Sequence, residues 1–159
     1  MRILIISDSH GRREQLEKVF HKAGKVDMVI HLGDVGADVE YIRKHAGCET
    51  HIIKGNNDFN VDVPKEEILQ IGKYKVWLTH GHRYHVNWEL ETIADEAAGI
   101  GMDIVLFGHL HIPIIEYRSN VTLINPGSVS LPRQENRKGS YILMEIDREQ
   151  EAHFSVAYL

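Results

Sequence analysis

Disulfide bonds within this chain are excluded, because Cys48 is the single cysteine among its 159 residues. A domain of this size buries roughly 70% of the surface that its unfolded chain exposes, so a core can form without such links. Scarce cysteine fits a reducing compartment, and we expect a cytoplasmic protein with one domain over residues 1–159. Long apolar runs are also lacking. The apolar run at the start ends at Ser7 and Asp8, which is too short for a signal peptide or a membrane span.

Positive charge is in deficit, since 18 Lys and Arg residues face 23 Asp and Glu residues for a net charge of −5. A protein that binds nucleic acid nonspecifically needs a basic face to replace the counterions of the phosphates, so a nucleic-acid partner is not expected. A small substrate that bears a phosphate remains compatible with this charge, because a local metal site can outweigh the charge of the whole chain.

Apolar segments and helical patterns alternate in the first third of the chain. Residues 2–6, 27–32 and 50–54 have the apolar, β-branched character of buried parallel strands. Between them, residues 16–23 place Leu and Val on one helical face, and Asp38 can cap a second helix that runs to Ala46. This βαβαβ order predicts a largely parallel sheet.

The rest of the chain has more strand-like segments than helical ones. Residues 67–71 and 74–79 flank Gly72-Lys73 and predict a hairpin, and Asn87 can cap a helix after it. Further strands are expected at residues 103–107, 112–117, 121–125, 141–146 and 152–158. These segments predict a second, mostly antiparallel sheet. The expected fold class is therefore α/β, with two stacked mixed β-sheets flanked by helices in an α/β/β/α sandwich.

Histidine is abundant, with 11 residues against 4 Phe and 4 Met, and much of it lies in short clusters with Asp, Asn and Gly. Each cluster follows a predicted strand, and ligands of α/β sheets bind beyond the carboxyl ends of strands. Alone, each cluster could be a helix cap or a turn, but their shared position favours one common site. The clusters are Asp8-Ser9-His10, Gly33-Asp34, Gly55-Asn56-Asn57-Asp58, His80-Gly81-His82 and Gly108-His109-Leu110-His111.

These side chains are suited to divalent metal ions. Imidazole and carboxylate ligands without thiolate suit Mn, Fe, Zn or Ni. A central Asp can bridge two ions with its two oxygens, and two ions about 3.5–4 Å apart form a clamp for phosphoryl transfer. Two divalent ions would more than neutralise the carboxylates of Asp8 and Asp34, which would leave a local trap for anions. We therefore expect a hydrolase that cleaves phosphate esters.

The order of the clusters resembles the calcineurin-like metallophosphoesterase family. Together with residues 30–34 (Ile-His-Leu-Gly-Asp) and 124–133 (Ile-Asn-Pro-Gly-Ser-Val-Ser-Leu-Pro-Arg), the resemblance covers nearly the whole chain. It is closest to the small one-domain prokaryotic branch of YfcE-like phosphodiesterases. The resemblance implies a phosphodiesterase with two divalent ions, and monoesters are an alternative substrate. We expect Mn first, with Ni, Fe or Zn as alternatives, a small phosphate ester as the substrate, and a possible homo-oligomer.

The resemblance also implies a role for each ligand. Asp34 would bridge the two ions, and a hydroxide between them would attack phosphorus in line with the leaving oxygen. The first ion would be held by Asp8, His10, Asp34 and His111, and the second by Asp34, Asn56, His80 and His109.

The catalytic position departs from the wider family, because Asn57 stands where many members have His. An amide has no proton to transfer at neutral pH, so we expect a weak general-acid step and a preference for good leaving groups. His82 is expected either to contact phosphate or donate a proton, or to support a neighbouring ligand. His31 is expected in the core, and Arg133 in a salt bridge or, alternatively, at the substrate phosphate.

Two other functions are weighed against this one. A non-catalytic metal-binding or protein-interaction scaffold is one, since a retromer subunit of eukaryotic sorting complexes uses the same fold with a degraded metal site. A nuclease is the other, since larger relatives cut DNA. The complete set of expected ligands favours an enzyme over a scaffold, and the acidic charge balance argues against a nuclease.

Overall fold

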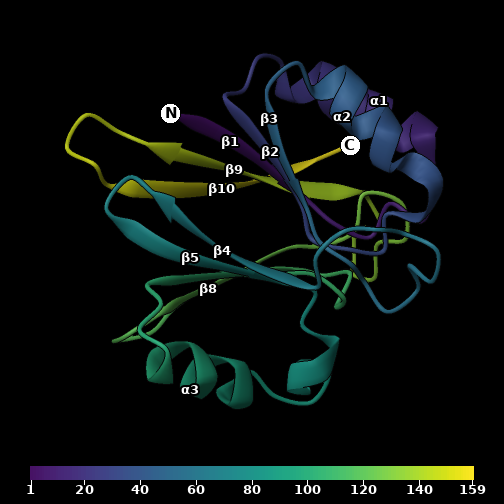
Figure 1. Cartoon of the computed structure of the whole chain (residues 1–159). Helices are drawn as coiled ribbons and strands as arrows, with labels where there is room; N and C mark the ends of the chain where they lie inside the picture. The colour runs from purple at the N-terminus through teal and green to yellow at the C-terminus, as the bar shows by residue number, and fades with distance from the viewer.

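Two five-stranded sheets stack face to face in the computed structural model, which describes residues 1–159. Helices cover the outer face of each sheet, so that the layers run α/β/β/α as predicted (Figure 1). The first sheet has the order β10-β9-β1-β2-β3. Its strands are β1 (Arg2–Ile6), β2 (Met28–His31), β3 (Glu49–Ile52), β9 (Ser140–Ile146) and β10 (Ala152–Tyr158).

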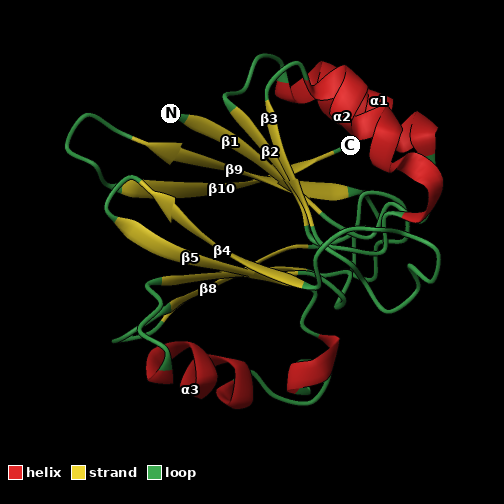
Figure 2. Cartoon of the chain, viewed as in Figure 1, coloured by secondary structure: helices red, strands yellow, loops and turns green.

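The second sheet has the order β4-β5-β6-β8-β7. Two helices, α1 and α2, lie outside the first sheet, and α3 lies outside the second (Figure 2). The strands are β4 (Glu66–Ile71), β5 (Tyr74–Thr79), β6 (Ile104–Phe107), β7 (Pro113–Tyr117) and β8 (Thr122–Pro126). The helices are α1 (Arg13–Ala23), α2 (Val39–Ala46) and α3 (Glu91–Gly99), with short 3₁₀ turns η1 (Gly36–Asp38) and η2 (His82–Tyr84). Every helix is too short or too polar to cross a lipid bilayer.

Alternation along the strands divides the core into layers. Ile3 and Ile5 of β1 face the second sheet, whereas Leu4 and Ile6 face the helices, because successive strand residues point to opposite faces. Leu16 and Val19 of α1 pack on that outer face, and a third cluster fills the space under α3. Apolar burial on both faces fixes the register of the central strands, and therefore fixes where each strand ends.

The second sheet is mixed, so the prediction of a mostly antiparallel sheet is wrong. Strands β5, β6 and β8 run parallel, and only the edge strands β4 and β7 are antiparallel to their neighbours. The buried run of β6 is apolar throughout, which is typical of a central parallel strand covered on both faces. Strands β9 and β10 extend the first sheet instead, where Ile142 and Met144 pair with Ile5 and Ile3.

Neither predicted helix cap forms. The Asp38 carboxylate makes no capping bond and instead accepts hydrogen bonds from Nε and Nη2 of Arg13, at 3.2 and 3.1 Å. Helix α3 begins at Glu91, several residues after Asn87. The amide of Asn87 lies 2.8 Å from Nε2 of His109. Both polar side chains therefore link separate segments rather than helix ends. The hairpin around Gly72-Lys73 forms as predicted.

Candidate metal centre

All five clusters follow the carboxyl ends of strands, as the strand pattern predicts. They come after β1, β2 and β3 of the first sheet and after β5 and β6 of the second. The loops that carry them gather at one end of the sandwich (right in Figure 2). The structure therefore brings together side chains that lie up to about a hundred residues apart in the chain, such as Asp8 and His109, whose backbone N–H donates to the Asp8 carboxylate at 3.1 Å.

The backbone at the clusters is held in an unusual conformation. Five Asp and His residues have a φ between 49° and 72°, in the left-handed region that residues with a Cβ rarely adopt. Such residues cost of order 1–3 kcal/mol each and persist where the surrounding structure imposes them. The residues are Asp8, His10, Asp34, His109 and His111. Backbone bonds impose the conformation at β1, where the N–H groups of Asp8 and His10 donate to the carbonyls of Gly33 and Asp34.

Two glycines let the backbone approach the carboxylates closely. A Cβ on Gly55 would lie 2.2 Å from both the backbone nitrogen and Oδ1 of Asp34. A Cβ on Gly108 would lie 2.2 Å from Oγ of Ser7 and 3.1 Å from Oδ2 of Asp8. No side chain fits at these distances, so glycine at both positions is required by the packing of the loops around Asp8 and Asp34.

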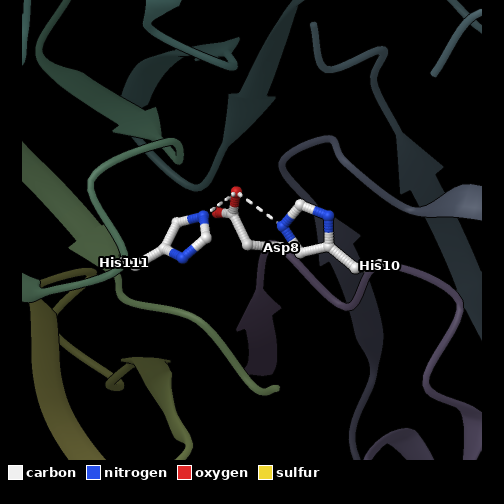
Figure 3. A group of neighbouring side chains, drawn as sticks. All are labelled: Asp8, His10 and His111. Carbon is white, nitrogen blue, oxygen red and sulfur yellow. Dashed lines mark ion pairs between the residues drawn. The ribbon is translucent and has the colours of Figure 1, made fainter. Parts of the chain in front are cut away.

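Asp8, His10 and His111 form the first group of ligand atoms (Figure 3). Oδ1 of Asp8 lies 3.0 Å from Nε2 of His111 and 3.9 Å from Nε2 of His10. Nδ1 of His111 lies 2.8 Å from the carbonyl oxygen of Leu131, an acceptor, so this nitrogen carries the proton of the neutral imidazole. Nε2 of that tautomer presents a lone pair to a carboxylate oxygen. A cation between the two atoms would satisfy both.

His80 repeats this arrangement beside Asp34. Its Nδ1 lies 2.6 Å from the carbonyl oxygen of Leu32, which leaves the lone pair of Nε2 directed at other acceptors. Oδ1 of Asn56 is 3.1 Å from this nitrogen, and Oδ1 of Asp34 is 3.6 Å from it. Ligand atoms that share one ion at about 2.0–2.2 Å lie roughly 3–4 Å from one another. The spacing around His80 therefore fits a second ion.

Asp34 stands between the two groups. Its Oδ1 faces Nε2 of His80 at 3.6 Å, and its Oδ2 faces Nε2 of His10 at 3.8 Å. The side chain is almost completely buried. Each oxygen is thus directed at a different imidazole, which is the orientation that a carboxylate needs to bridge two ions.

Two buried atoms of this region have no hydrogen-bond partner. They are Oδ1 of Asp8 and Nε2 of His10. An unsatisfied buried polar group costs about 1–3 kcal/mol, and more where it is charged. Both atoms face the space between Asp8, His10 and Asp34, where a bound cation would accept their lone pairs. The donor set therefore fits a divalent metal better than it fits a site without one.

Burial and hydrogen bonding keep Asp8, His10 and His109 in the forms that bind metals. Burial lowers the pKa of His10 and lowers the pKa of His109 to about 4, so both imidazoles are neutral near pH 7. The hydroxyl of Ser7 donates a hydrogen bond to the Asp8 carboxylate at 2.5 Å, which favours its charged form. A carboxylate and neutral imidazoles are the species that metals bind.

His109 approaches this region from β6. Its ring centroid lies 5.2 Å from that of His80, and its Nε2 is engaged by the amide of Asn87 at 2.8 Å. Nδ1 is therefore the nitrogen left for an ion. Nothing in the sequence pattern of Asn87 indicates this contact, because its position before a helical segment favours a cap.

Asn57 and His82, the two predicted catalytic residues, lie beside different ligand residues. The backbone N–H and the amide of Asn57 both donate to Asp34, to Oδ1 at 2.8 Å and to Oδ2 at 2.6 Å. The exposed ring of His82 lies 5.4 Å from that of His80 and 6.1 Å from that of His109, measured between centroids. Burial lowers the pKa of His82.

Asp58 is a residue whose importance the sequence interpretation missed. Its buried carboxylate accepts hydrogen bonds from the backbone N–H groups of Val35, Gly36 and Gly55. It thereby ties the loop of Asp34 to the loop of Asn56. An Asp at the end of the loop cluster Gly-Asn-Asn-Asp is the signal that could have indicated it, since Asp side chains in turns commonly accept backbone N–H bonds.

The remaining predicted residues lie outside the two groups of ligand atoms. His31 is buried in the core as expected, with Nε2 2.9 Å from Oγ of Ser9. The loop at residues 125–128 is structural, since the hydroxyl of Ser128 donates to the Asp8 carbonyl at 2.7 Å. Arg133 forms no salt bridge, contrary to expectation. Its position is fixed through its backbone N–H, which donates to the carbonyl of His111 at 3.0 Å.

Comparison with known proteins agrees with this geometry. The family model described as "Calcineurin-like phosphoesterase superfamily domain" matches residues 1–149. A relative described as "Probable metallophosphoesterase YsnB", from Bacillus subtilis, is 38% identical over 152 residues, which are 94% of this chain and 86% of the relative. The name of this relative describes a probable metal-dependent enzyme that cleaves phosphate esters.

Two solved structures share the fold at lower identity. YfcE, described as a phosphoesterase from E. coli, has a TM-score of 0.69 and 24% identity, with 99% of this chain and 98% of that chain covered. Wild-type Vps29 from Entamoeba histolytica, solved in complex with Zn²⁺, has a TM-score of 0.77 and 21% identity, with 99% of both chains covered. The match of the family model over most of the chain and the identity to the B. subtilis relative carry the assignment. This protein belongs to the calcineurin-like phosphoesterase superfamily, in agreement with the order of its Asp, Asn and His clusters.

Proposed function

We propose that the protein is a cytoplasmic phosphodiesterase that holds two divalent ions and hydrolyses a small phosphate ester. The observation that supports this most strongly is the orientation of Asp34. Its two oxygens face the imidazoles of His10 and His80, and Asp8 and Asn56 complete the ligand atoms on either side. Bridging by one carboxylate places two ions close enough to act on the same phosphate.

The ligands divide into two sets that share Asp34. N and O ligands suit Mn, which we propose as the metal, and also Ni, Fe or Zn. The first set is Asp8, His10, Asp34 and His111, and the second is Asp34, Asn56, His80 and His109. When bound, the ions supply Lewis acidity, which activates water and neutralises charge on the phosphate.

The protein's own groups orient the ligands. Backbone carbonyls of Leu32 and Leu131 fix the tautomers of His80 and His111, and the amide of Asn57 holds Asp34 by its Oδ2. Asn57 can donate a hydrogen bond to a phosphate oxygen but has no proton to give to the leaving group. We therefore expect nitrophenyl esters to be cleaved faster than alkyl esters, with His82 as the nearby candidate for phosphate contact. Equal rates for the two esters, with chemistry rate-limiting, would contradict the assignment of Asn57.

The test is hydrolysis of bis(p-nitrophenyl) phosphate by chelator-stripped protein before and after addition of Mn. We expect activity to depend on Mn and to be lost in Asp34→Asn and His109→Ala. The matched controls are Asp62→Asn and His21→Ala, which change exposed residues of the same types and should leave the rate unchanged. Activity that persists in Asp34→Asn with full Mn would exclude the bridging role.

A non-catalytic scaffold is the second candidate, because Vps29 shares the fold. Metal content distinguishes it from the enzyme. Absence of bound metal together with absence of turnover, after trials with Mn, Ni, Fe and Zn, would favour the scaffold. Bound metal without turnover of this substrate would instead indicate an enzyme with a narrow substrate range.

A further inference from the structure

A hollow of about 340 Å³ lies beside the metal centre and is lined by cationic and polar residues alone. We call it the cationic pocket. Its lining residues are Lys54, Gly55, Lys65, His82 and Arg83. Three permanent positive charges therefore face one hollow in a chain whose net charge is −5.

Backbone contacts bring these residues together from three segments. The N–H of Lys54, after β3, donates to the carbonyl of Pro64 at 2.7 Å, which places Lys54 beside the segment that contains Lys65. Strand β4 begins after Lys65, and its register pairs Glu66 with Thr79, so Lys65 lies near the start of the His80 loop. Arg83 belongs to η2 in that loop. The fold itself thus assembles the pocket.

None of the three cations of the pocket is paired with a carboxylate, although unpaired surface cations are ordinary by themselves. The charges of Asp34 and Glu66 nevertheless act on His82. The carboxylate of Glu66, next to Lys65, accepts a hydrogen bond from the hydroxyl of Tyr84 at 2.8 Å instead. Other hollows differ in this respect. The one over α2, for example, carries Glu40 and Asp62 together with its arginine.

The cationic pocket shares a wall with the metal centre. Gly55 lines the pocket, and its Cα is so close to Asp34 that a Cβ would lie 2.2 Å from Oδ1. His82 also lines the pocket, with its ring centroid 5.4 Å from that of His80 and 6.1 Å from that of His109. One ligand could therefore place an anionic group in the pocket and a phosphate at the metal centre.

We propose that the cationic pocket binds a second phosphate group of the substrate, so that the preferred substrate is a small phosphodiester that carries a further phosphate. This inference rests on the proposed phosphodiesterase function. Lysine and arginine are the residues that bind phosphate, and a hollow between them offers several donors to one dianion. A continuous nucleic-acid strand needs a track of cations along the surface, whereas these charges converge on one pocket.

The test compares two substrates with the same scissile bond and leaving group. Thymidine 5′-(p-nitrophenyl phosphate) has one phosphate, and its 3′-phosphorylated derivative has two. In Mn-loaded wild-type protein at low salt, we expect kcat/KM to be roughly tenfold higher for the derivative, mainly through KM, because several exposed cations contact the added dianion. Added salt should reduce this preference, since it screens exposed charges.

Variants of the pocket should remove the preference. In Lys65→Ala and in Lys54→Ala/Arg83→Ala, we expect the ratio of the two kcat/KM values to fall towards one. The matched controls Lys25→Ala and Lys44→Ala change exposed lysines outside the pocket and should keep the wild-type ratio. Thermal melting of each variant shows whether it is folded, and the ratio itself is independent of the amount of active protein.

The outcomes separate this inference from the proposed function. Hydrolysis of neither substrate would count against the phosphodiesterase. Hydrolysis of both substrates with a ratio of kcat/KM values near one in the wild type would overturn the inference about the cationic pocket and leave the proposed function standing. The same holds if the pocket variants leave the ratio unchanged. Preference for a single-stranded thymidine oligonucleotide over the doubly phosphorylated nucleoside, lost in the same variants, would also overturn it, because a nucleic-acid strand would then be the occupant.

Discussion

Replacement of Asp58 should separate the two loops that carry Asp34 and Asn56. In Asp58→Ala, the backbone N–H groups of Val35, Gly36 and Gly55 lose an acceptor at 3.2, 2.8 and 2.9 Å. Each buried donor without a partner costs about 1–3 kcal/mol, and water that enters the vacated space recovers part of that. We therefore expect the free energy of unfolding to fall by about 3 kcal/mol.

The isosteric variant Asp58→Asn refines this expectation. Its amide keeps one oxygen, which can serve either the two N–H groups that share Oδ2 or the single N–H at Oδ1, but never both sets. The loss should therefore be smaller, about 1–2 kcal/mol. Urea denaturation of metal-stripped protein measures both values, with Asp62→Ala, an exposed aspartate of the same loop, as the control.

Metal binding gives the second readout for Asp58. Looser attachment of Asn56 to Asp34 should weaken binding of the second ion, so Mn titration should show reduced affinity at that site in both variants. The reasoning is refuted if Asp58→Ala unfolds at the same urea concentration as Asp62→Ala. It also fails if the unfolding midpoint drops while both Mn affinities match the wild type, because the carboxylate would then stabilise the fold without positioning the ligands.

Three further predictions concern packing, protonation and metal. Gly55→Ala should abolish Mn-dependent activity because its Cβ would clash with Asp34, whereas Gly99→Ala, with no atom within 4 Å of its Cβ, should keep full activity. Burial lowers the pKa of His31 to about 4 from 6.5, so the unfolded chain binds a proton that the folded chain does not. This difference alone should lower the unfolding free energy by about 3 kcal/mol from pH 7 to pH 4, so the loss over that range should be about 3 kcal/mol smaller in His31→Gln, as urea denaturation at both pH values would show. Mn at about a hundred times its Kd should raise the unfolding free energy by about 2.7 kcal/mol, and a thermal shift that is the same in Asp34→Asn would contradict binding at this site.

The convergence of the Asp, Asn and His clusters could be predicted from the sequence because a general rule of α/β sheets governs it. Parallel strands of one sheet end at one edge, so polar residues after β1, β2 and β3 meet at the edge of the first sheet, and those after β5 and β6 meet at the edge of the second. The stacking of the two sheets then brings the two sets together. Apolar and β-branched segments likewise located all ten strands. The positions of the strands and of the polar clusters after them depend on local sequence patterns, which can be read without knowledge of the fold.

Strand partners and side-chain contacts could not be predicted in the same way. The alternation in β9 fits either sheet, and only the match of Ile142 and Met144 to the face of Ile5 and Ile3 selects the first. Asn87 precedes a helical segment as a cap would, yet it bonds to His109, because loop geometry brings the two together.

The cationic pocket illustrates the same limit. Lys54, Lys65 and Arg83 are separate single charges in the sequence, where each has the appearance of an ordinary solvated residue. Only the backbone bond between Lys54 and Pro64 and the register of β4 with β5 bring them into one hollow.

The left-handed backbone at Asp8, His10, Asp34, His109 and His111 has a consequence for how such a protein changes over evolutionary time. Glycine would relieve the backbone at each of these positions, by about 1 kcal/mol or more, so backbone conformation alone disfavours the side chains found there. The proposed metal site would account for their retention. In a lineage that no longer needs the proposed reaction, substitutions at these positions would be tolerated wherever the relief of strain offsets the loss of hydrogen bonds such as those that Asp34 accepts from Asn57. The sandwich would then survive the loss of its chemistry, because its cores lie between the sheets and under the helices.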